Sequence, residues 1–278
     1  MQLRRAITGA LLLGPAVLFL GAWYAVPVGN VLLMSVGYPG LTGIHLLKFF
    51  REPVYLDVLQ TTFMMSAVIT AICVVLGYPA AYLVATVGPR ARAWLLIAIM
   101  LPFTTSMLVR TYAWMALLGR DGIVNQTMLA LGIWGTPARL MHNTTGVLVG
   151  MVHVMAPFMI LSMYAVMRNI DLGLCRAAET LGARPAVSHL TVYLPLALPG
   201  VAAGSLLVFM LSLGFYITPA LLGSTRDVWI AMLVEIQLNQ VLDWNFAAAI
   251  ATVLLVVTVI LYVVYVKLFG ESRLGQLS

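Results

Sequence analysis

Residues 253–266 read VLLVVTVILYVVYV, a run without a single charged side chain. The uncharged window around it extends from Trp244 to Val266. A bilayer core about 30 Å thick is crossed by about 20 residues of apolar helix. The run lacks the alternation of apolar and polar residues that is typical of membrane β-barrel strands. This stretch therefore predicts a membrane-spanning helix.

Five further windows of the chain are equally free of charge. They lie at residues 6–47, 58–88, 93–109, 142–167 and 185–225. Over all 278 residues, 62% are hydrophobic and 9% are charged, whereas soluble domains carry about a quarter charged residues. This composition excludes a water-soluble fold, a disordered chain and a disulfide-rich scaffold. We expect an all-α membrane protein with a single domain over residues 1–278 and spans near residues 8–34, 58–87, 94–118, 144–167, 194–219 and 245–267.

The N-terminal run resembles a signal peptide because two arginines precede it. It continues to Met34, however, and a cleaved signal has an apolar core of only about 7 to 15 residues. We therefore expect an uncleaved first span.

The charges outside the spans are distributed unevenly between the two sides. With the N-terminus inside, the cytoplasmic segments hold three acidic residues, Asp171, Glu179 and Glu271, and nine basic ones. The basic residues are Arg4, Arg5, Arg90, Arg92, Arg168, Arg176, Arg184, Lys267 and Arg273. The outer segments hold five basic and six acidic residues. By the positive-inside rule we expect both termini in the cytoplasm. The net charge of +6 reflects topology, and no basic motif predicts a nucleic-acid partner.

The sequence contains no motif of a catalytic or metal site. Walker, HExxH and GxSxG triad patterns are absent. Cys73 and Cys175 fall in a span and in a cytoplasmic segment, so we expect no disulfide and no metal ligation. Away from their ends the predicted spans contain no Asp, Glu or Lys, which argues against ion-coupled transport. We interpret His153, in the fourth span, as a hydrogen-bonded helix-packing residue in preference to a proton site.

The segment between the fourth and fifth spans carries the strongest functional signal. Residues 167–200 read MRNIDLGLCRAAETLGARPAVSHLTVYLPLALPG. Asp171 is suited to cap a short helix, Gly182 to end it in a left-handed conformation, and Pro185 to begin a second one. This pattern predicts a helical elbow at about residues 168–193. Two adjacent alanines give it a small face that fits the groove of a soluble partner, and an interfacial helix on lipid headgroups is the open alternative.

The elbow resembles the EAA loop of ABC importer permeases, whose pattern is EAAxxxG followed downstream by LPxxxPG. The matching positions are Ala177, Ala178, Gly182, Pro195, Pro199 and Gly200. Arg176 stands where the pattern has glutamate, and Glu179 lies three residues later. In that family the elbow docks on a cytoplasmic ATPase. The resemblance implies an ATPase-coupling set of Asp171, Arg176, Ala177, Ala178, Glu179, Leu181 and Gly182.

Three other stretches are similar to spermidine/putrescine permeases. They are LPFTTSMLVRTYAWMALLGRDGIVN at 101–125, FYITPALLGS at 215–224 and LGYPAAYLVA at 76–85. The resemblance implies a six-helix bundle like that of type I importer permeases, in the bacterial inner membrane. It also implies a second permease subunit, two ATPase subunits that bind ATP and Mg, and an external solute-binding protein. This chain itself is expected to be no enzyme and to hold no cofactor.

The resemblance favours a polyamine such as spermidine or putrescine as the cargo. Another small organic or anionic solute is the nearest alternative. An ion-coupled secondary transporter, a channel and a membrane scaffold are alternatives of other classes.

Polar residues in and near the spans are candidates for a transport path or gate. They are Thr104, Thr105, Ser106, Arg110, Asp121, Tyr216, Thr218 and Glu235. Arg110 has two readings, an anchor at the outer interface or a partner of an outer carboxylate such as Asp121. Coulomb repulsion disfavours its direct contact with a polycation, whereas an anionic cargo could bind it.

Two short amphipathic helices are expected outside the spans. Residues 229–239, WIAMLVEIQLN, predict an outer helix bearing Glu235. Three interpretations of this helix are open: a gate, a docking surface for the binding protein, or a lid without specificity. IHLLKFFRE, residues 44–52, predicts an interfacial helix on membrane lipid.

Overall fold

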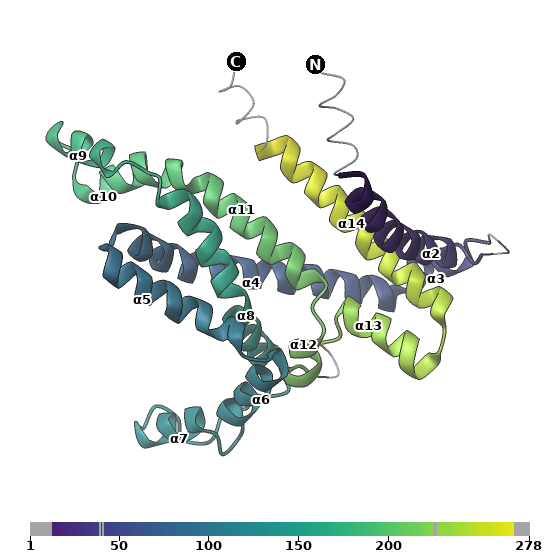
Figure 1. The fold of residues 1–278 in the computed structure, drawn as a ribbon. Coiled ribbons are helices and arrows are strands. Elements are labelled where there is room, and N and C mark those ends of the chain that lie inside the picture. Colours follow the sequence, from purple (N-terminus) through teal and green to yellow (C-terminus); the bar gives the residue numbers. More distant parts are fainter. Residues whose placement is uncertain (1–12, 39, 41, 225–226, 270–278) are drawn as a thin grey trace, which may run out of the picture. The chain divides into compact units, whose positions relative to one another are not determined.

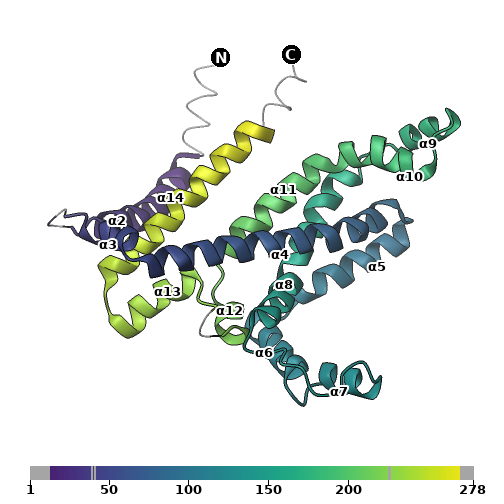
Figure 2. The same ribbon diagram turned by 180° about the vertical axis from the view of Figure 1, so that it is seen from behind.

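The computed structural model describes residues 13–38, 40, 42–224 and 227–269, and these residues form helices and connecting turns without a strand (Figures 1 and 2). Arg4, Arg5, Arg226, Glu271 and Arg273, which entered the charge balance, lie outside the described residues. Among these described residues, five helices are long and apolar enough to span a membrane: Leu13–Ser35, Pro53–Thr86, Thr144–Met167, Pro185–Leu213 and Trp244–Lys267. A bent pair, Pro89–Thr104 and Met107–Ala130, supplies a sixth when counted as one span. The all-α membrane fold is confirmed.

The helices divide into two compact units, and each is described by itself. The first comprises Met1–Asp57 and Leu233–Val257, and the second Val58–Met232 and Thr258–Ser278. The first contains η1 (Gly21–Ala25), α2 (Val26–Ser35), α3 (Ile44–Arg51), η4 (Gln237–Val241) and the first half of α14 (Trp244–Phe269). The single domain over the whole chain stays a prediction.

In the first unit, α3 packs on the start of α14 through aromatic rings. Phe49 and Phe246 are fully buried, and Tyr55 contacts both, stacked at 5.9 Å on the first and edge-on at 4.9 Å to the second. The Lys48 ammonium lies 4.4 Å from the centre of the Phe246 ring, a cation–π contact. The expected 44–52 helix is thus present as α3, held by its aromatic face.

The second unit contains the rest of the helices. They are α4 (Pro53–Thr86, of which the first residues belong to the other unit), α5 (Pro89–Met100), η2 (Leu101–Thr104), α6 (Met107–Leu118), α7 (Ile123–Ala130), α8 (Thr144–Met167), α9 (Leu172–Thr180), α10 (Pro185–Ser188), η3 (His189–Tyr193), α11 (Leu194–Leu213) and α12 (Ile217–Leu222). The helix α13 (Ile230–Ile236) begins in this unit and ends in the first.

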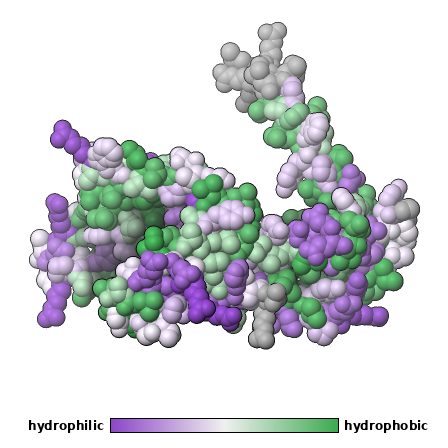
Figure 3. Space-filling view, turned by 90° about the horizontal axis from the view of Figure 1, so that it is seen from below, coloured by the Kyte–Doolittle hydropathy of each residue, from purple (hydrophilic) through white to green (hydrophobic). Residues whose placement is uncertain are grey.

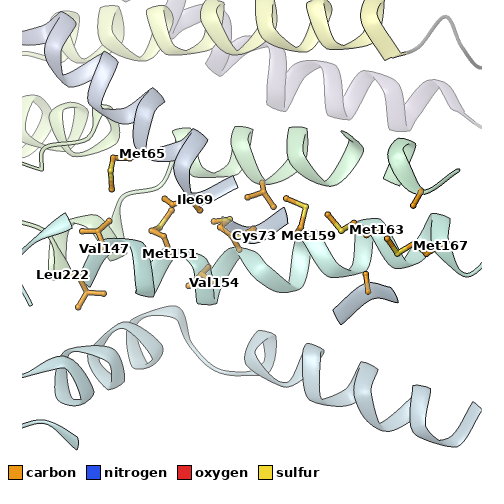
Figure 4. Close-up of a cluster of buried hydrophobic side chains, with 14 of the residues drawn as sticks. Met65, Ile69, Cys73, Val147, Met151, Val154, Met159, Met163, Met167 and Leu222 are labelled. Carbon is orange, nitrogen blue, oxygen red and sulfur yellow. The ribbon is translucent and has the colours of Figure 1, made fainter. Parts of the chain in front are cut away.

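The core of the second unit is a ridge of methionines along α8. Every fourth residue from 151 to 167 is a buried Met, and the ridge faces Ile69 and Cys73 of α4 (Figure 4). Residues four apart share one face of a helix, so the five side chains form a continuous stripe. Methionine is unbranched and adaptable, which suits an interface between helices that change their packing.

The helix α11 approaches α8 closely because it presents glycines to it. A Cβ at Gly200 would lie 2.9 Å from Cβ of Val166, and one at Gly204 would lie 2.8 Å from Sδ of Met159. Glycines four residues apart let two helix backbones meet, as in small-residue membrane interfaces. Gly200, which ends the LPLALPG motif, therefore has a packing role.

The second, third and fifth predicted spans differ from the structure. The second begins earlier than predicted, at Pro53. The third is not one straight helix over 94–118, because the chain bends by 96° between the two members of the bent pair. Pro102 lacks the N–H of a regular helix turn, and Thr105 is extended (φ −97°, ψ 144°). The fifth begins earlier than predicted, since Pro185–Leu213 is continuous, and it ends at Leu213, before the separate helix α12.

Hydrophobic side chains are widely exposed, as expected for a surface that meets lipid or other subunits. Figure 3 shows them in green over one face, interrupted by hydrophilic groups. Leu18, Trp23, Val75 and Trp94 are all more than two-thirds exposed. Soluble monomers rarely expose apolar patches of this extent.

Candidate functional site

The elbow predicted at 168–193 consists of α9, α10 and η3, at one end of the α8–α11 pair (Figures 1 and 2). The Asp171 carboxylate accepts a hydrogen bond from the Gly173 N–H at 2.8 Å and caps α9. Gly182 adopts φ +97°. Its N–H donates to Glu179 O (3.0 Å) and that of Ala183 to Ala178 O (3.1 Å), the two bonds of a Schellman motif. Both ends of α9 are therefore fixed locally.

The residues of the predicted ATPase-coupling set lie mainly on the exposed surface of the elbow. Leu181 is 89% exposed, the highest fraction among the described large hydrophobic residues. Arg176, Ala177, Glu179 and the two caps are also exposed, whereas Ala178 is half-buried. An exposed leucine flanked by charges and small side chains is the composition of a docking surface. The coupling role of these residues stays a prediction.

The inner side of the elbow is fastened to the bundle. Within the elbow, the fully buried Ser188 hydroxyl of α10 donates to Cys175 O of α9 at 2.9 Å, which holds the two short helices together. The adjacent His189 has its Nε2 2.9 Å from the hydroxyl of Tyr78 on α4. Its ring stacks on Tyr193 at 5.0 Å. The sequence reasoning missed this cluster, although pairs of aromatic residues four apart on two helices were a possible signal.

Three of the path candidates occupy the break between η2 and α6. The hydroxyls of Thr104 and Thr105 donate to Leu101 O (2.7 Å) and Pro102 O (2.9 Å), carbonyls near the break. Ser106 precedes α6, and its carbonyl accepts from Arg110 N at 3.1 Å. All three hydroxyl side chains are exposed. The break thus concentrates polar groups within an otherwise apolar stretch.

Arg110 lies on α6 and is half-buried. Its Nε has no hydrogen-bond partner among the described residues. One turn further along α6, Trp114 meets His153 of α8 edge-on at 5.5 Å. Asp121 is exposed, and its main-chain carbonyl accepts from Gln126 at 2.8 Å. Within the described parts of the chain no ion pair joins Arg110 to Asp121.

The remaining candidates have contrasting environments. Thr218 of α12 is fully buried, its hydroxyl 3.4 Å from that of Thr111 on α6, and it packs where Gly150 of α8 leaves room. Tyr216, two residues earlier, is 38% exposed. Glu235 lies on α13, in the other unit, and accepts a hydrogen bond from Asn239 at 3.3 Å. A role in transport stays a prediction for each.

Asp227 connects the start of α8 to the segment that follows α12 in the second unit. Its carboxylate accepts hydrogen bonds from the hydroxyls of Thr144 (2.8 Å), at the start of α8, and Ser224 (2.7 Å), and from the Ser224 N–H (3.2 Å). Burial acts to raise the pKa of this carboxyl, but the hydrogen bonds from Ser224 and Thr144 outweigh it and leave the pKa below its ordinary value. The ionised Asp227 carboxylate therefore holds Ser224 and the start of α8 together in this conformation.

A cavity of about 580 Å³ is lined in part by basic side chains. Arg120, Arg139 and His142 contribute to its wall, together with Leu118 and residues 137–141. The buried Asn125 holds this wall in place, because its side chain donates to Gly119 O (3.0 Å) and Ala138 O (3.1 Å) and accepts from Ala138 N (2.9 Å). Each of these bonds fixes the backbone next to an arginine. No group of metal-ligating residues occurs in the described part of the chain.

Comparisons with known proteins agree with this architecture. Residues 74–274 match the family of binding-protein-dependent transport system inner membrane components. The spermidine/putrescine permease protein PotB of Escherichia coli (strain K12) is 33% identical over 214 residues, covering 77% of this chain and 78% of that protein. The molybdenum permease protein ModB of Mycobacterium bovis is 34% identical over 203 residues, covering 71% and 75%.

A solved structure shares the fold. It is a bacterial alginate ABC transporter in complex with an alginate pentasaccharide-bound periplasmic protein, with a TM-score of 0.76 at 16% identity over 95% of this chain and 94% of that chain. The family match covers well over half of the chain. The chain is therefore a permease component of an ABC importer, a member of the binding-protein-dependent transport system inner membrane components.

Proposed function

We propose that this chain forms one half of the membrane pathway of an ATP-driven polyamine importer. A second permease subunit forms the other half, and two cytoplasmic ATPase subunits bind ATP and Mg. An external solute-binding protein delivers the cargo at the outer face of a bacterial inner membrane. Both termini of this chain lie in the cytoplasm, as the distribution of basic residues indicates.

The observation that carries the proposal is the elbow. A short helix fixed at both ends by Asp171 and Gly182, with Leu181 89% exposed, is a rigid protrusion with an apolar tip. A rigid element transmits a push without absorbing it by local bending. Closure of the ATPases would move the elbow, and through it the helix α11, so that the bundle alternates between outward and inward openings.

The broken helix supports a path at the η2–α6 junction. Irregular backbone at membrane depth is tolerated where it is buried in protein or lines a water-filled cavity. In this chain the hydroxyls of Thr104, Thr105 and Ser106 are exposed. We infer that they face the interior between the two permease subunits. An uncharged polar lining passes a solute without holding it tightly.

The cargo class rests on the similarity to PotB. A polycation would have to be recognised by groups other than Arg110, because Coulomb repulsion disfavours that contact. One observation favours the alternative of an anionic solute. The Nε of Arg110 has no partner among the described residues, and the related M. bovis protein is named as a molybdenum permease. Arg110 therefore distinguishes the two cargo classes.

The basic cavity supports a docking site for the delivering protein. Arg120, Arg139 and His142 would complement acidic side chains, and the Asn125 hydrogen bonds hold the wall before the partner arrives. A preformed site loses little ordering entropy on association. Electrostatic complementarity of this kind chiefly raises the association rate.

Uptake by the purified complex in proteoliposomes tests the proposal. Spermidine uptake should require the binding protein and ATP, and vanadate should abolish it. Gly182→Val should reduce uptake at least about 10-fold, because a β-branched residue is strained at φ +97° and would disrupt the end of α9. Gly88→Val, at a position with open space and an ordinary φ, is the matched control.

Three results would contradict the proposal. Uptake that collapses with the ion gradient and needs no ATPase indicates a secondary transporter. Normal ATP-driven uptake by Gly182→Val refutes the coupling role. Molybdate uptake in place of spermidine uptake, lost in Arg110→Gln, assigns the anionic cargo.

A further inference from the structure

The elbow is joined to α4 by a cluster of four rings. Tyr78 and Tyr82 come from α4, and His189 and Tyr193 from η3. The Tyr82 ring stands at 90° to those of His189 and Tyr193, with centroids 5.0 Å apart in both pairs. Edge-to-face pairs at such distances are favourable beyond their buried area. The cluster is thus a specific contact between two segments more than a hundred residues apart.

A π-turn orients the two rings of η3. The Leu194 N–H donates to His189 O, five residues back, in place of the four of an α-helix. This turn belongs to the continuous helix Pro185–Leu213 and lies directly after the elbow helix α10. Single π-turns are rare and occur frequently at functional positions. Here the turn directs His189 and Tyr193 together toward α4.

Two hydrogen bonds made by consecutive residues connect α9 to this cluster and to α4. Ser188 donates to Cys175 O of α9, and the next residue, His189, shares a hydrogen bond with Tyr78 of α4. Ser188 is fully buried, and Tyr193 is only 1% exposed. A displacement of α9 therefore reaches α4 through two hydrogen bonds and a set of packed rings. The rest of α9 contacts α4 by no hydrogen bond that the described residues reveal.

The C-terminal part of α4, which carries Tyr78 and Tyr82, contains a site where the helix can bend. Pro79 lies between the two tyrosines, inside the helix, and removes one main-chain hydrogen bond there. Proline is a common site of helix bending. The last turn of α4 is meanwhile held by Arg92, whose guanidinium donates to Val84 O, Ala85 O and Val87 O at 3.0 to 3.2 Å. The bond that Pro79 cannot make would reach the carbonyl of residue 75, so the helix is weakened just before Tyr78, and the segment from Tyr78 onward can bend there as a unit.

We propose that His189 is a positioning residue that makes the cytoplasmic end of α4 move with the coupling elbow. This inference rests on the proposed coupling role of the elbow. The His189–Tyr78 hydrogen bond transmits the motion of α9 to a second span, in addition to the covalent route through α10 and α11. Without this bond, closure of the ATPases moves the elbow and α11, but the cytoplasmic end of α4 does not move with them.

Amide hydrogen exchange on the whole complex tests the inference. The probe is MgATP with vanadate, which needs no knowledge of the cargo. In the unaltered complex, trapping should change exchange in both residues 171–184 and residues 76–86. In Tyr78→Phe and His189→Phe the change at 171–184 should persist, while that at 76–86 falls about 3- to 10-fold, the range expected from losing one hydrogen bond.

The controls separate a lost link from a lost fold. Thr191→Val removes a hydroxyl of the same turn whose one hydrogen bond among the described residues is to Val187 O, and the variant should respond like the unaltered complex at both segments. The double variant of Tyr78→Phe and His189→Phe should be no worse than either single one, because both break the same bond. Spermidine uptake per ATP hydrolysed should fall in parallel with the response of α4. Where His189→Phe fails to assemble, Tyr78→Phe alone decides.

Two outcomes overturn different statements. If the unaltered complex shows no ATP-dependent change at 171–184, the proposed coupling function fails. If it responds at both segments and Tyr78→Phe responds equally, the coupling function stands and the role of His189 is refuted.

Discussion

At the scale of the residue, glycines set how closely the helices approach. Glycine inside a helix destabilises it by about 0.5 to 1 kcal/mol relative to alanine. Gly200 and Gly204 nevertheless lie in the interior of α11, where a Cβ would collide with Val166 and Met159. The close approach lets the methionine stripe of α8 fill the space between α4 and α11.

We predict that Gly200→Leu destabilises the protein by about 1 to 2 kcal/mol. Overpacking a helix contact costs about 1 to 3 kcal/mol, and leucine gains up to about 1 kcal/mol of helix propensity over glycine. Thermal unfolding in detergent measures the difference. Ala203→Leu, at an exposed position of the same helix, should leave the midpoint nearly unchanged. Equal midpoints for the two variants would refute the close-packing role.

At the scale of the element, the ends of helices are held by side chains from elsewhere. Arg92 of α5 binds the carbonyls at the end of α4, and Asp227 binds Thr144 at the start of α8. The last carbonyls of a helix have no partner within it, so the Arg92 bonds satisfy them and fix α5 against α4, whereas Asp227 bonds the side-chain hydroxyl of Thr144. At the break before α6 the bonds are local instead, because the hydroxyls of Thr104 and Thr105 donate to carbonyls three residues back.

We predict that Asp227→Asn lowers the free energy of unfolding by about 1 kcal/mol at pH 7. Hydrogen bonds to a charged group are worth about 1.5 to 3 kcal/mol, and partial exposure reduces this value. Because the pKa of Asp227 is depressed, its contribution is complete above the unfolded pKa of about 4 and disappears as the pH falls through the folded pKa. Unfolding at pH 7 and below pH 4 measures this dependence.

The pH series has its own control. Asp57→Asn removes an exposed carboxylate and should have little effect at either pH. If Asp227→Asn lowers the free energy of unfolding as much below pH 4 as at pH 7, the charge of the carboxylate contributes nothing to stability.

At the scale of the whole molecule, the pattern of charge predicts which segments lie inside and which outside. The elbow with Arg168, Arg176 and Arg184 follows α8, and the loop with Arg139 precedes it. A single pass of α8 through the membrane places these two segments on opposite sides. The elbow must then face the cytoplasm if it meets an ATPase.

We predict opposite accessibility for cysteines at the two ends of α8. In a background of Cys73→Ala and Cys175→Ala, Pro137→Cys should react with an impermeant maleimide in intact spheroplasts. Thr180→Cys should react only after the membrane is opened. Both native residues are exposed, so burial does not limit the reaction. Labelling of Thr180→Cys in intact spheroplasts would reverse the proposed orientation.

The sequence by itself determined the features that depend on neighbouring residues. Charge-free windows predicted the spans, and Asp171, Gly182 and Pro185 predicted the ends of the elbow helices, because caps and left-handed glycines act within a few residues. Only the tertiary structure decided which side chains meet across helices. In the folded chain Thr218 is buried, and Arg110 forms no ion pair with Asp121 among the described residues. The Asp227 carboxylate accepts a hydrogen bond from Thr144, and His189 shares one with Tyr78. Such pairs depend on how helices pack, which no local pattern of residues encodes.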